Sequence, residues 1–574
     1  MTNPERTDVR FEANEKPPTS LTVGLGLQMA ILCIAGIVLT PVVVIQAAGG
    51  AEEFLTWAVF AAVLISGATT ILQAVRIGRI GAGYVLLMGT SGAFISVCIT
   101  AIAKGGPAML ATLVIVSALF QFALAARLAL FRRILTQTVA GTVIMLIPVS
   151  VMPILFDLFK DVPEGVSPSA APLSLAVTVG VIAGIALKAR GTLRMWSPVI
   201  GVLAGTIVGG FYGIYDTGRI AEAAWIGIPT SGWPGLDLTF GPLFWSLLPA
   251  FIFVTLVGAI ETIGDSVAIQ RVSWRRQKAV DFRAVQGAVA ADGIGNLLSG
   301  LFGTVPNTTY SSSVSVTELT GIASRRIGVA IGVIFLALAF LPKALASVIA
   351  IPSPVAGGYI MVLLAMLFIV GMKIIVKDGV DYRKGLIAGI GFWAGVGFQN
   401  EVIFPEIFAE FAGGLLQDGM TGGGLVAITM SAFVEITRRR RSRIEAILDP
   451  ASLPDLRDFV ARFVKQNRWG DAMVTRLETA VEETMLTMIG QKTKSQSRRM
   501  LLSAHKDGNE AVLEFIASSG DGNLQDQITL LTDATPEANL EQEVSLRMLR
   551  HISSSVRHQS YHDTDVVIVN VKAP

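Results

Sequence analysis

The sequence predicts an all-α polytopic membrane protein of about 14 spans, followed by a soluble α+β domain at its C-terminal end. Of its 574 residues, 52% are hydrophobic and only 15% are charged, whereas soluble proteins carry about 25% charged residues. Apolar segments recur at nearly regular spacing from Leu21 to Ile436. After Arg441, charged and apolar residues alternate and no run is long enough to span. The membrane part therefore ends shortly before Arg441.

A helix of about 20 residues crosses the hydrocarbon core of about 30 Å, so most of the expected spans are long enough. Several are too short or too rich in glycine to be simple helices. The run that begins at Leu21 is too long for a signal peptide, so we expect it to be retained as the first span. Residues 1–20 are then a polar tail, 21–436 the membrane domain, 437–452 a basic linker and 453–574 the soluble domain. The predicted spans are 21–45, 57–74, 82–102, 107–130, 136–157, 170–187, 196–214, 241–260, 284–303, 306–322, 327–349, 354–372, 385–398 and 418–436.

Basic residues predict how the chain is oriented. They gather in alternate loops, whereas the loops between hold isolated cations, and this asymmetry places the basic loops and both termini in the cytoplasm. We therefore expect a multi-pass protein of the inner membrane with an even number of spans. The basic loops hold Arg76 and Arg79; Arg132 and Arg133; Lys188, Arg190 and Arg194; Arg271, Arg275, Arg276 and Lys278; Arg325 and Arg326; Lys373, Lys377, Arg383 and Lys384; and Arg438 to Arg441.

Two segments break the helical pattern at corresponding positions of the two halves. Residues 81–94, in the third span, and residues 303–316, leading into the tenth, combine glycine, proline and hydroxyl residues. Backbone freed from a helix is tolerated at membrane depth only where protein or a water-filled cavity covers it. Paired breaks of this kind indicate an inverted repeat with a binding site near the midplane, as in secondary transporters. The alternative is two glycine-rich packing surfaces.

Three carboxylates lie in or beside the predicted spans. Glu261 and Asp265 are four residues apart at the end of the eighth span, hence on one helical face, and Asp292 lies in the ninth. A carboxylate inside a span costs about 2.5–3.5 kcal/mol, and more where it faces lipid. The three therefore favour a shared polar cavity, in which a protonated carboxyl can carry a proton or donate to a ligand. The alternative is that the first two pair with the arginines that follow.

A run of neutral hydroxyl groups, residues 308–313, follows the ninth span. A cavity lined by carboxylates and hydroxyls with few cations suits a neutral heterocycle or a cation better than an inorganic anion. We expect no enzyme, cofactor or metal site, because dinucleotide, Walker and serine-hydrolase motifs are missing and Cys33 and Cys98 lie in apolar runs. His558 and His562, four residues apart, are more typical of a surface turn than of a metal site.

These segments resemble the signature of the nucleobase/ascorbate transporters, the xanthine and uracil permeases. The likeness covers about residues 20–436 and rests on 292–311, 319–325, Glu261-Thr-Ile-Gly-Asp265, Gly26-Leu-Gln28 and Met88-Gly-Thr-Ser91. It implies a 7+7 inverted repeat with core and gate domains, a homodimer in lipid, no nucleic-acid partner, and H⁺- or Na⁺-coupled uptake of xanthine, uric acid, uracil or a related heterocycle. By the match, Glu261 binds the substrate and Asp265 and Asp292 support it or carry the proton. Gln28, Phe94, Ser311, Ser312 and Ser313 line the pocket.

The sequence departs from the family pattern on the tenth span. Where the family usually has Gln or Glu, then Asn, then a glycine two positions further on, this chain has Ser312, Ser313 and Ser315. A serine hydroxyl cannot reproduce the two-point contact of an amide or carboxylate with a planar base. Two alternatives therefore stay open: the same fold carrying a carboxylate or sulfonate, and a non-transporting receptor that signals through its C-terminal domain.

The soluble part is predicted to contain helices at 453–466, 471–490 and 540–552 and strands at 498–505, 511–518 and 564–572. Residues 477–487 resemble a helix of the histidine-kinase/anti-sigma-factor ATPase fold, in which an asparagine chelates magnesium. Thr487 stands at that position here, Ala517 or Ser518 replaces the adenine-reading aspartate, and the glycine-rich lid is absent around Ser545. The resemblance implies a degenerate sensory or dimerising domain. An unrelated α+β module, such as the anion-transporter regulatory fold, is the alternative.

Overall fold

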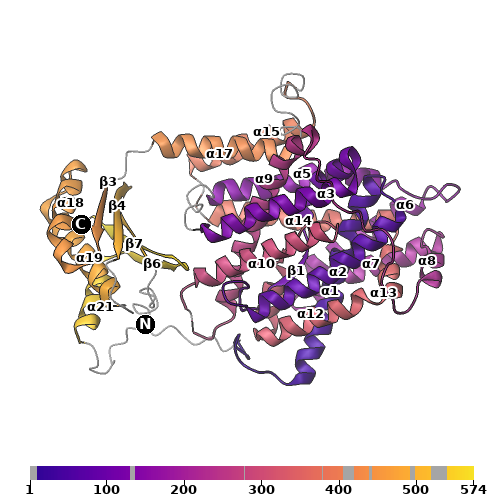
Figure 1. Ribbon diagram of the computed structural model, residues 1–574, viewed down its shortest axis with the longest axis horizontal. Helices are drawn as coiled ribbons and strands as arrows, with labels where there is room; N and C mark the ends of the chain where they lie inside the picture. The colour runs from indigo at the N-terminus through magenta and orange to yellow at the C-terminus, as the bar shows by residue number, and fades with distance from the viewer. Residues whose placement is uncertain are drawn as a thin grey trace. The chain divides into compact units, whose positions relative to one another are not determined.

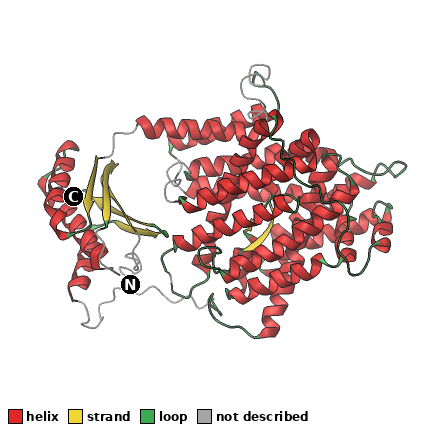
Figure 2. Cartoon of the chain, in the orientation of Figure 1, coloured by secondary structure: helices red, strands yellow, loops and turns green. Residues whose placement is uncertain are grey.

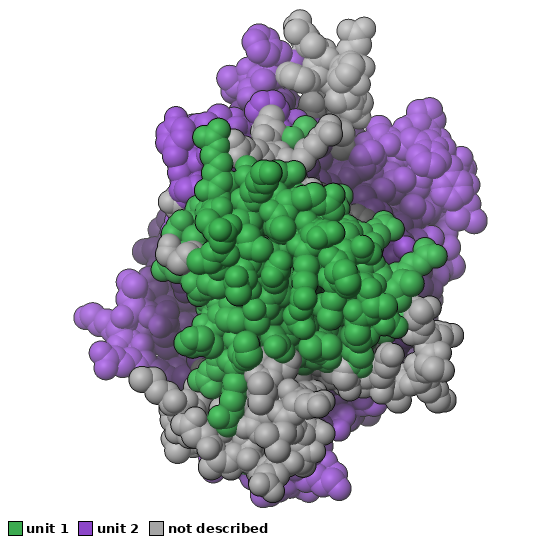
Figure 3. All heavy atoms as spheres, turned by 90° about the vertical axis from the view of Figure 1, so that its left-hand side faces the viewer, with its two compact units in different colours: residues 1–6, 274–286, 436–574 green, residues 7–273, 287–435 purple. Residues whose placement is uncertain are grey.

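The computed structural model describes residues 9–128, 136–276, 278–377, 379, 381–404, 419–437, 442–490, 498–518 and 540–573. Helices make up most of it (Figure 2). Two compact units are distinguished in Figure 3, and we treat them separately. The membrane unit comprises residues 7–273 and 287–435, and the C-terminal unit includes residues 274–286 and 436–574. The basic residues Arg132, Arg133 and Arg438 to Arg441 lie outside the described residues.

The helices of the membrane unit follow the apolar segments of the sequence (Figure 1). Within the described residues, eight helices are long and apolar enough to cross a membrane, or nine if α12 and α13 form one bent span. The helices of the membrane unit carry large exposed apolar side chains such as Leu187, Phe211 and Trp393, as expected for contact with lipid. The helices are α1 (Thr19–Ala47), α2 (Glu52–Val75), η1 (Gly92–Phe94), α3 (Ile95–Ala126), α5 (Gln137–Leu158), α6 (Ala170–Lys188), α7 (Thr192–Phe211), α8 (Thr217–Glu222), α9 (Pro242–Val272), α10 (Phe282–Leu301), α11 (Ser312–Thr320), α12 (Arg325–Ala339), α13 (Pro342–Ile349), α14 (Ser353–Lys377), α15 (Tyr382–Gln399) and α17 (Gly419–Thr437).

Glycines allow the closest helix pairs to form. A Cβ on Gly67 of α2 would lie 2.8 Å from the carbonyl oxygen of Gly332 on α12, and one on Gly332 would lie 2.6 Å from that of Gly67. Gly141 of α5 and Gly371 of α14 face each other in the same way, with corresponding distances of 2.6 and 2.7 Å. Side chains at these four positions would force the backbones apart, so small residues determine the packing of both pairs.

Three predicted spans differ from the observed helices in where the helix breaks. The expected spans at 82–102 and 107–130 meet in α3, which kinks at Gly106 (φ 79°), directly before Pro107. The straight segment predicted over 327–349 is observed as two helices, α12 and α13, which are bent by 88° relative to each other. Pro342 starts α13, and its ring cannot continue the preceding helix. Average hydropathy does not detect such a bend.

Two short strands cross inside the helical membrane unit. β1 (Leu87–Thr90) and β2 (Asn307–Tyr310) pair antiparallel, with Gly89 opposite Thr308. Both lie in the segments in which the sequence predicts broken helices. The ladder satisfies backbone groups that no helix accommodates there. The Tyr310 ring lies over Gly89, where an added Cβ would come within 2.4 Å of the Cζ atom of the ring.

The N-terminal segment is paired with the α11–α12 connection, a contact that the sequence did not suggest. The Arg10 amide donates to the Gly321 carbonyl at 2.7 Å, and the Ala323 amide donates to the Phe11 carbonyl at 2.8 Å. The Ser324 hydroxyl donates to the Glu15 carbonyl at 2.6 Å. This part of the predicted polar tail is therefore held against the membrane unit.

The C-terminal unit contains a five-stranded antiparallel sheet of order β3-β4-β5-β7-β6. Its apolar core lies between the sheet and three helices, with Leu477, Phe515 and Val569 fully buried. All three predicted helices and all three predicted strands are present, and the sequence did not predict β3 and β6. The elements are β3 (Ser442–Ile447), η2 (Pro450–Ser452), α18 (Leu453–Gln466), α19 (Asp471–Gly490), β4 (Arg499–Asp507), β5 (Glu510–Ser518), α21 (Leu540–Ile552), β6 (Ser555–Ser560) and β7 (Thr564–Lys572).

The prediction of a surface turn at His558 is wrong. His558 lies in β6 with 2% of its surface exposed, and its Nε2 atom is 3.4 Å from Asp565 Oδ1. Arg498 reaches the other oxygen of Asp565 at 3.3 Å. The sequence contains no sign of this buried charged cluster, because its three members come from separate strands or their edges. No group of three or more His, Cys, Asp or Glu suited to a metal occurs among the described residues.

Candidate functional site

The two carboxylates of α9 lie inside the helix rather than at its end. α9 continues to Val272, about three turns beyond the predicted limit of residue 260. Asp265 is buried, and Glu261, one turn earlier, is partly exposed. Glu261 and Asp265 therefore do not have the arrangement of the alternative, in which both would lie at the membrane interface and pair with the arginines that follow. The extended helix brings the carboxylates beside β2.

Asp265 is held by two hydroxyls from β2 and the residue that follows it. Thr309 donates to Oδ2 at 2.9 Å, and Ser311 donates to Oδ1 at 2.6 Å. Both carboxylate oxygens therefore accept a hydrogen bond. The orientation of Asp265 depends on the strand, because Thr309 and Ser311 are placed by the β1–β2 pairing.

Asp292 is completely buried on α10 and is bonded on one side only. Its Oδ2 atom accepts hydrogen bonds from Gln121 Nε2 at 2.7 Å and from Thr262 Oγ1 at 2.8 Å. Its Oδ1 atom has no hydrogen-bond partner among the described residues. The two oxygens of this carboxylate are thus chemically distinct, and Oδ1 is the one available to a proton or another group.

The aspartates belong to one polar cluster, which we call the carboxylate cluster and define as Glu261, Thr262, Asp265, Asp292 and Thr309. Thr309 Oγ1 lies 3.4 Å from Thr262 Oγ1, so the threonines join the two aspartates. The like charges of both aspartates act on Glu261, which lies near them. The structure therefore brings together the three carboxylates that the sequence singled out. This arrangement suits transfer of a proton and binding of a group with N–H donors.

An aromatic side chain borders the cluster. Phe94 ends η1, is 1% exposed, and lies 6.3 Å from Phe251 between ring centroids. Gly258, one turn before Glu261, faces both Phe94 Cε2 and Thr308 Oγ1, because an added Cβ would lie 3.8 and 3.9 Å from them. Thr308 Oγ1 is buried and has no hydrogen-bond partner among the described residues. An edge carbon of the Phe94 ring and an unused hydroxyl therefore meet at Gly258.

The three predicted serines have different environments. Ser311 binds Asp265, as described above, and Ser312 Oγ lies 3.5 Å from Cys33 Sγ on α1. Ser313 is buried and donates to the Tyr310 carbonyl at 2.7 Å, so its hydroxyl is occupied by the backbone. Gln28 is partly buried on α1, and no hydrogen bond joins it to the carboxylate cluster within the described part of the chain.

Sequence reasoning missed two buried amides on neighbouring helices. Asn296 Nδ2 donates to Gln121 Oε1 at 2.7 Å, and Asn296 Oδ1 accepts from the Asn307 amide at 2.7 Å. Gln121 lies 171 residues from Asp292 in the chain, so sequence proximity could not relate them. A polar side chain deep in an apolar span is itself a signal, because it must find a partner.

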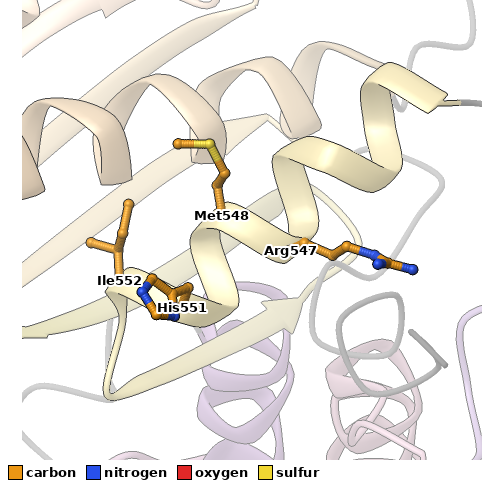
Figure 4. A pocket seen from close by; sticks show the side chains of 4 residues that line it. All are labelled: Arg547, Met548, His551 and Ile552. Carbon is orange, nitrogen blue, oxygen red and sulfur yellow. The ribbon is translucent and has the colours of Figure 1, made fainter. Parts of the chain in front are cut away.

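Thr487 and Ala517, two positions that the sequence compares with the ATPase fold, are buried in the C-terminal unit. Thr487 is buried and donates to the Glu483 carbonyl of its own helix at 2.7 Å, so its hydroxyl is occupied. Ala517 is buried in β5. A hollow of about 290 Å³ lies on α21, lined by Arg547, Met548, His551 and Ile552 (Figure 4). These four side chains come from one helix and form a surface depression.

Comparisons with known proteins identify the family of the membrane part. A model of the xanthine/uracil permeases, described as "Permease family", matches residues 21–401. The chain is 28% identical over 424 residues to a protein of Clostridium perfringens named as a purine permease, covering 71% of this chain and 89% of that protein. It is 26% identical over 443 residues to the xanthine permease XanP of Escherichia coli K12, covering 74% of this chain and 95% of XanP.

A likeness to a solved structure concerns the fold alone. The murine Slc26a9 anion transporter in the inward-facing state has 13% sequence identity and a TM-score of 0.51, over 75% of this chain and 71% of that chain. The family match covers most of the sequence and includes every residue of the carboxylate cluster. The relatives are permeases and not enzymes. The chain therefore belongs to the xanthine/uracil permease family, the nucleobase/ascorbate transporters, and is a multi-pass membrane protein.

Proposed function

We propose that this permease is a secondary active transporter that takes up a nucleobase such as xanthine, uric acid or uracil, or a related heterocycle, together with H⁺ or Na⁺. The observation that carries the proposal is the carboxylate cluster, in which Glu261 lies beside two buried, hydrogen-bonded aspartates. Negative groups are expensive in a membrane and are kept where a polar site uses them. The purine and xanthine relatives support this substrate class.

In the proposed pocket, Glu261 accepts hydrogen bonds from N–H groups of the heterocycle. Phe94 offers an aromatic face to the flat ring, and Thr308 and Ser312 offer neutral hydroxyls that can donate or accept. Asp265 and Asp292 hold their neighbours in place, and one of them carries the coupled proton. A carboxylate or sulfonate substrate would meet like charges here, so the cluster disfavours that alternative.

The packing of the membrane unit supports 14 spans arranged as a 7+7 inverted repeat. α1 packs on α12 and β1, and α9, seven spans later, packs on α3 and β2. In the same way α6 packs on α14, and α15 packs on α5. The equivalent strands β1 and β2 run antiparallel, which an inverted repeat requires at its axis. In this arrangement the segments around α1–α3 and α9–α12 form the core domain, and α5–α7 with α14–α17 form the gate.

The remaining parts of the proposal concern the whole protein in its membrane. The basic loops favour cytoplasmic termini and residence in the inner membrane. A homodimer and a regulatory C-terminal domain follow from the family resemblance and from the degenerate positions at Thr487 and Ala517. The domain limits of 1–20, 21–436, 437–452 and 453–574 stay predictions.

Uptake by a Glu261→Gln variant tests the role of the cluster. The amide keeps the shape of the side chain but removes the charge that accepts the N–H groups. We expect uptake of labelled xanthine, uric acid and uracil to fall to background at normal membrane abundance. Glu53→Gln, an exposed glutamate at the start of α2, is the matched control and should transport normally. Full activity of Glu261→Gln would contradict the assigned role.

Binding by purified protein separates the proposed function from its rivals. A ligand present at 100 times its Kd stabilises the native state by about 2.7 kcal/mol, which raises the unfolding temperature. Stabilisation of the parent by a nucleobase, together with uptake, supports the transporter. Stabilisation without uptake in vesicles points to a receptor, and stabilisation only by a carboxylate or sulfonate points to another substrate class.

A further inference from the structure

Gln121 lies between β2 and Asp292, the aspartate whose Oδ2 atom is hydrogen-bonded and whose Oδ1 atom has no partner among the described residues. It is fully buried on α3, and both ends of its amide are used. Nε2 donates to Asp292 Oδ2, and Oε1 accepts from Asn296, at 2.7 Å in each case. Asp292 and Asn296 are four residues apart on α10, so the amide spans one helical turn of its neighbour.

The bonding partners determine how the Gln121 amide is oriented. The carboxylate of Asp292 can only accept while it is ionised, and the Nδ2 atom of Asn296 can only donate. If the Gln121 amide were turned around, its oxygen would face the Asp292 carboxylate and its N–H groups would face the N–H groups of the Asn296 side chain. The Asn296 side chain is oriented in turn by the backbone N–H group of Asn307, the first residue of β2. This group donates to Asn296 Oδ1 at 2.7 Å.

A continuous series of hydrogen bonds therefore leads from β2 to Asp292. It runs from the Asn307 amide through Asn296 and Gln121 to Asp292 Oδ2. The other end of the same strand holds Asp265 through Thr309 and Ser311. Both aspartates are thus aligned by one short strand, although they lie on different helices.

We propose that Gln121 is a positioning residue for proton coupling. Together with Thr262 it fills Asp292 Oδ2 and leaves Oδ1 as the atom that gains and loses the proton. Among the described residues, the other charged groups near Asp292 are Asp265 and Glu261, both on α9. This inference rests on the proposed proton-coupled transport and adds a residue that acts through Asp292 rather than on the substrate.

A second buried glutamine shows what a purely structural role looks like. Gln73 of α2 is also fully buried and uses both ends of its amide, but its partners are two backbone groups and the Met88 sulfur. Its Nε2 atom donates to the Ala288 carbonyl at 3.0 Å, and its Oε1 atom accepts from the Ala82 amide at 3.1 Å. Its described hydrogen bonds reach no carboxylate, so it is a matched control.

The decisive variant is Gln121→Glu, compared with Gln73→Glu. Glutamate keeps the shape of glutamine and still accepts from Asn296, but when ionised it cannot donate to Asp292. At pH 7.5 we expect the maximal rate of xanthine uptake per molecule to fall about 10- to 100-fold, as for loss of a hydrogen bond to a charged group. KM should change by less than about threefold. Uptake should recover in part at pH 5.5, where the introduced carboxyl group becomes protonated and can donate again.

Gln73→Glu should lower abundance without altering the pH profile of uptake per molecule. If Gln121→Glu transports with the parent's maximal rate and pH profile, the proposal is overturned. If that variant does not accumulate, Asn296→Asp replaces it, because aspartate still accepts from Asn307 but no longer donates to Gln121. The same loss of rate with little change in KM supports the proposal, and a rate like the parent's overturns it.

A measurement without substrate separates this inference from the proposed function. The unfolding temperature of the purified full chain is recorded from pH 5.5 to 8 for the parent and for Gln121→Glu. We expect the two pH dependences to differ, because the variant places a second carboxylate against Asp292. Identical dependences overturn the positioning role. If they differ while the parent transports no nucleobase, Gln121 acts on Asp292 and only the proposed function fails.

Discussion

Substitution of Asp292 by asparagine separates its charge from its hydrogen bonds. The asparagine oxygen can take the place of Oδ2 and still accept from Gln121 and Thr262, at 2.7 and 2.8 Å in the parent. Its NH₂ group then occupies the place of Oδ1, which has no partner among the described residues. An unsatisfied buried donor costs about 1–3 kcal/mol, whereas removing a buried charge recovers several kcal/mol of desolvation. The two terms largely cancel, so we expect near-normal abundance.

The same substitution should abolish coupling while leaving binding intact. We expect accumulation of labelled xanthine driven by a pH gradient to fall at least about 100-fold, equivalent to roughly 2.7 kcal/mol. Exchange of internal for external xanthine needs no net proton movement and should persist. Asp161→Asn, an exposed carboxylate that accepts from the Ser353 hydroxyl at 2.7 Å, is the control and should accumulate xanthine normally. Gradient-driven accumulation by Asp292→Asn at the parent's level would refute the reasoning.

Two further predictions concern the strands of the two units. Gly89→Ala places a methyl group 2.4 Å from the Tyr310 ring, so this ring must leave its place over β1 and its hydrogen bond to the Thr90 carbonyl. Uptake in vesicles should fall, and parent-like uptake would show that this contact between the strands is dispensable. Asp565→Ala removes the buried carboxylate that Arg498 binds, which should destabilise the C-terminal unit by about 3–5 kcal/mol. In limited proteolysis of the full chain, the part that follows Arg441 should then be cleaved faster than in the parent. An unchanged rate of cleavage would contradict the role of Asp565.

The membrane helices could be predicted largely from hydropathy, because lipid imposes a length and a composition on each span. The breaks at residues 81–94 and 303–316 could also be predicted, since glycine, proline and hydroxyl residues oppose a helix at membrane depth. The bend between α12 and α13 could not, because residues 327–349 are apolar apart from Lys343 and Ser347, and only Pro342 marks the bend. In the C-terminal unit, β6 was missed because polar residues occupy most of Ser555–Ser560.

The candidate site could be predicted in part. Glu261, Asp265 and Asp292 stand out as carboxylates among apolar residues, and the structure brings them together. Gln121 and Asn296 do not stand out, because a neutral amide lowers hydropathy only slightly and its partners are distant in sequence. Ser313 illustrates the opposite error, since its hydroxyl bonds to the Tyr310 carbonyl instead of being available to a ligand. Whether a polar side chain faces a ligand or its own backbone depends on packing that the sequence does not display.

The most direct test is the structure of the purified protein with xanthine bound at saturating concentration. We expect density for the heterocycle between η1 and the start of α11, stacked on Phe94, with a ring N–H group within hydrogen-bond distance of Glu261. Asp265 and Asp292 should keep their bonds to Thr309 and Gln121. Ligand density elsewhere, with the Glu261 carboxylate turned toward an arginine at the membrane face, would contradict the proposed transport site.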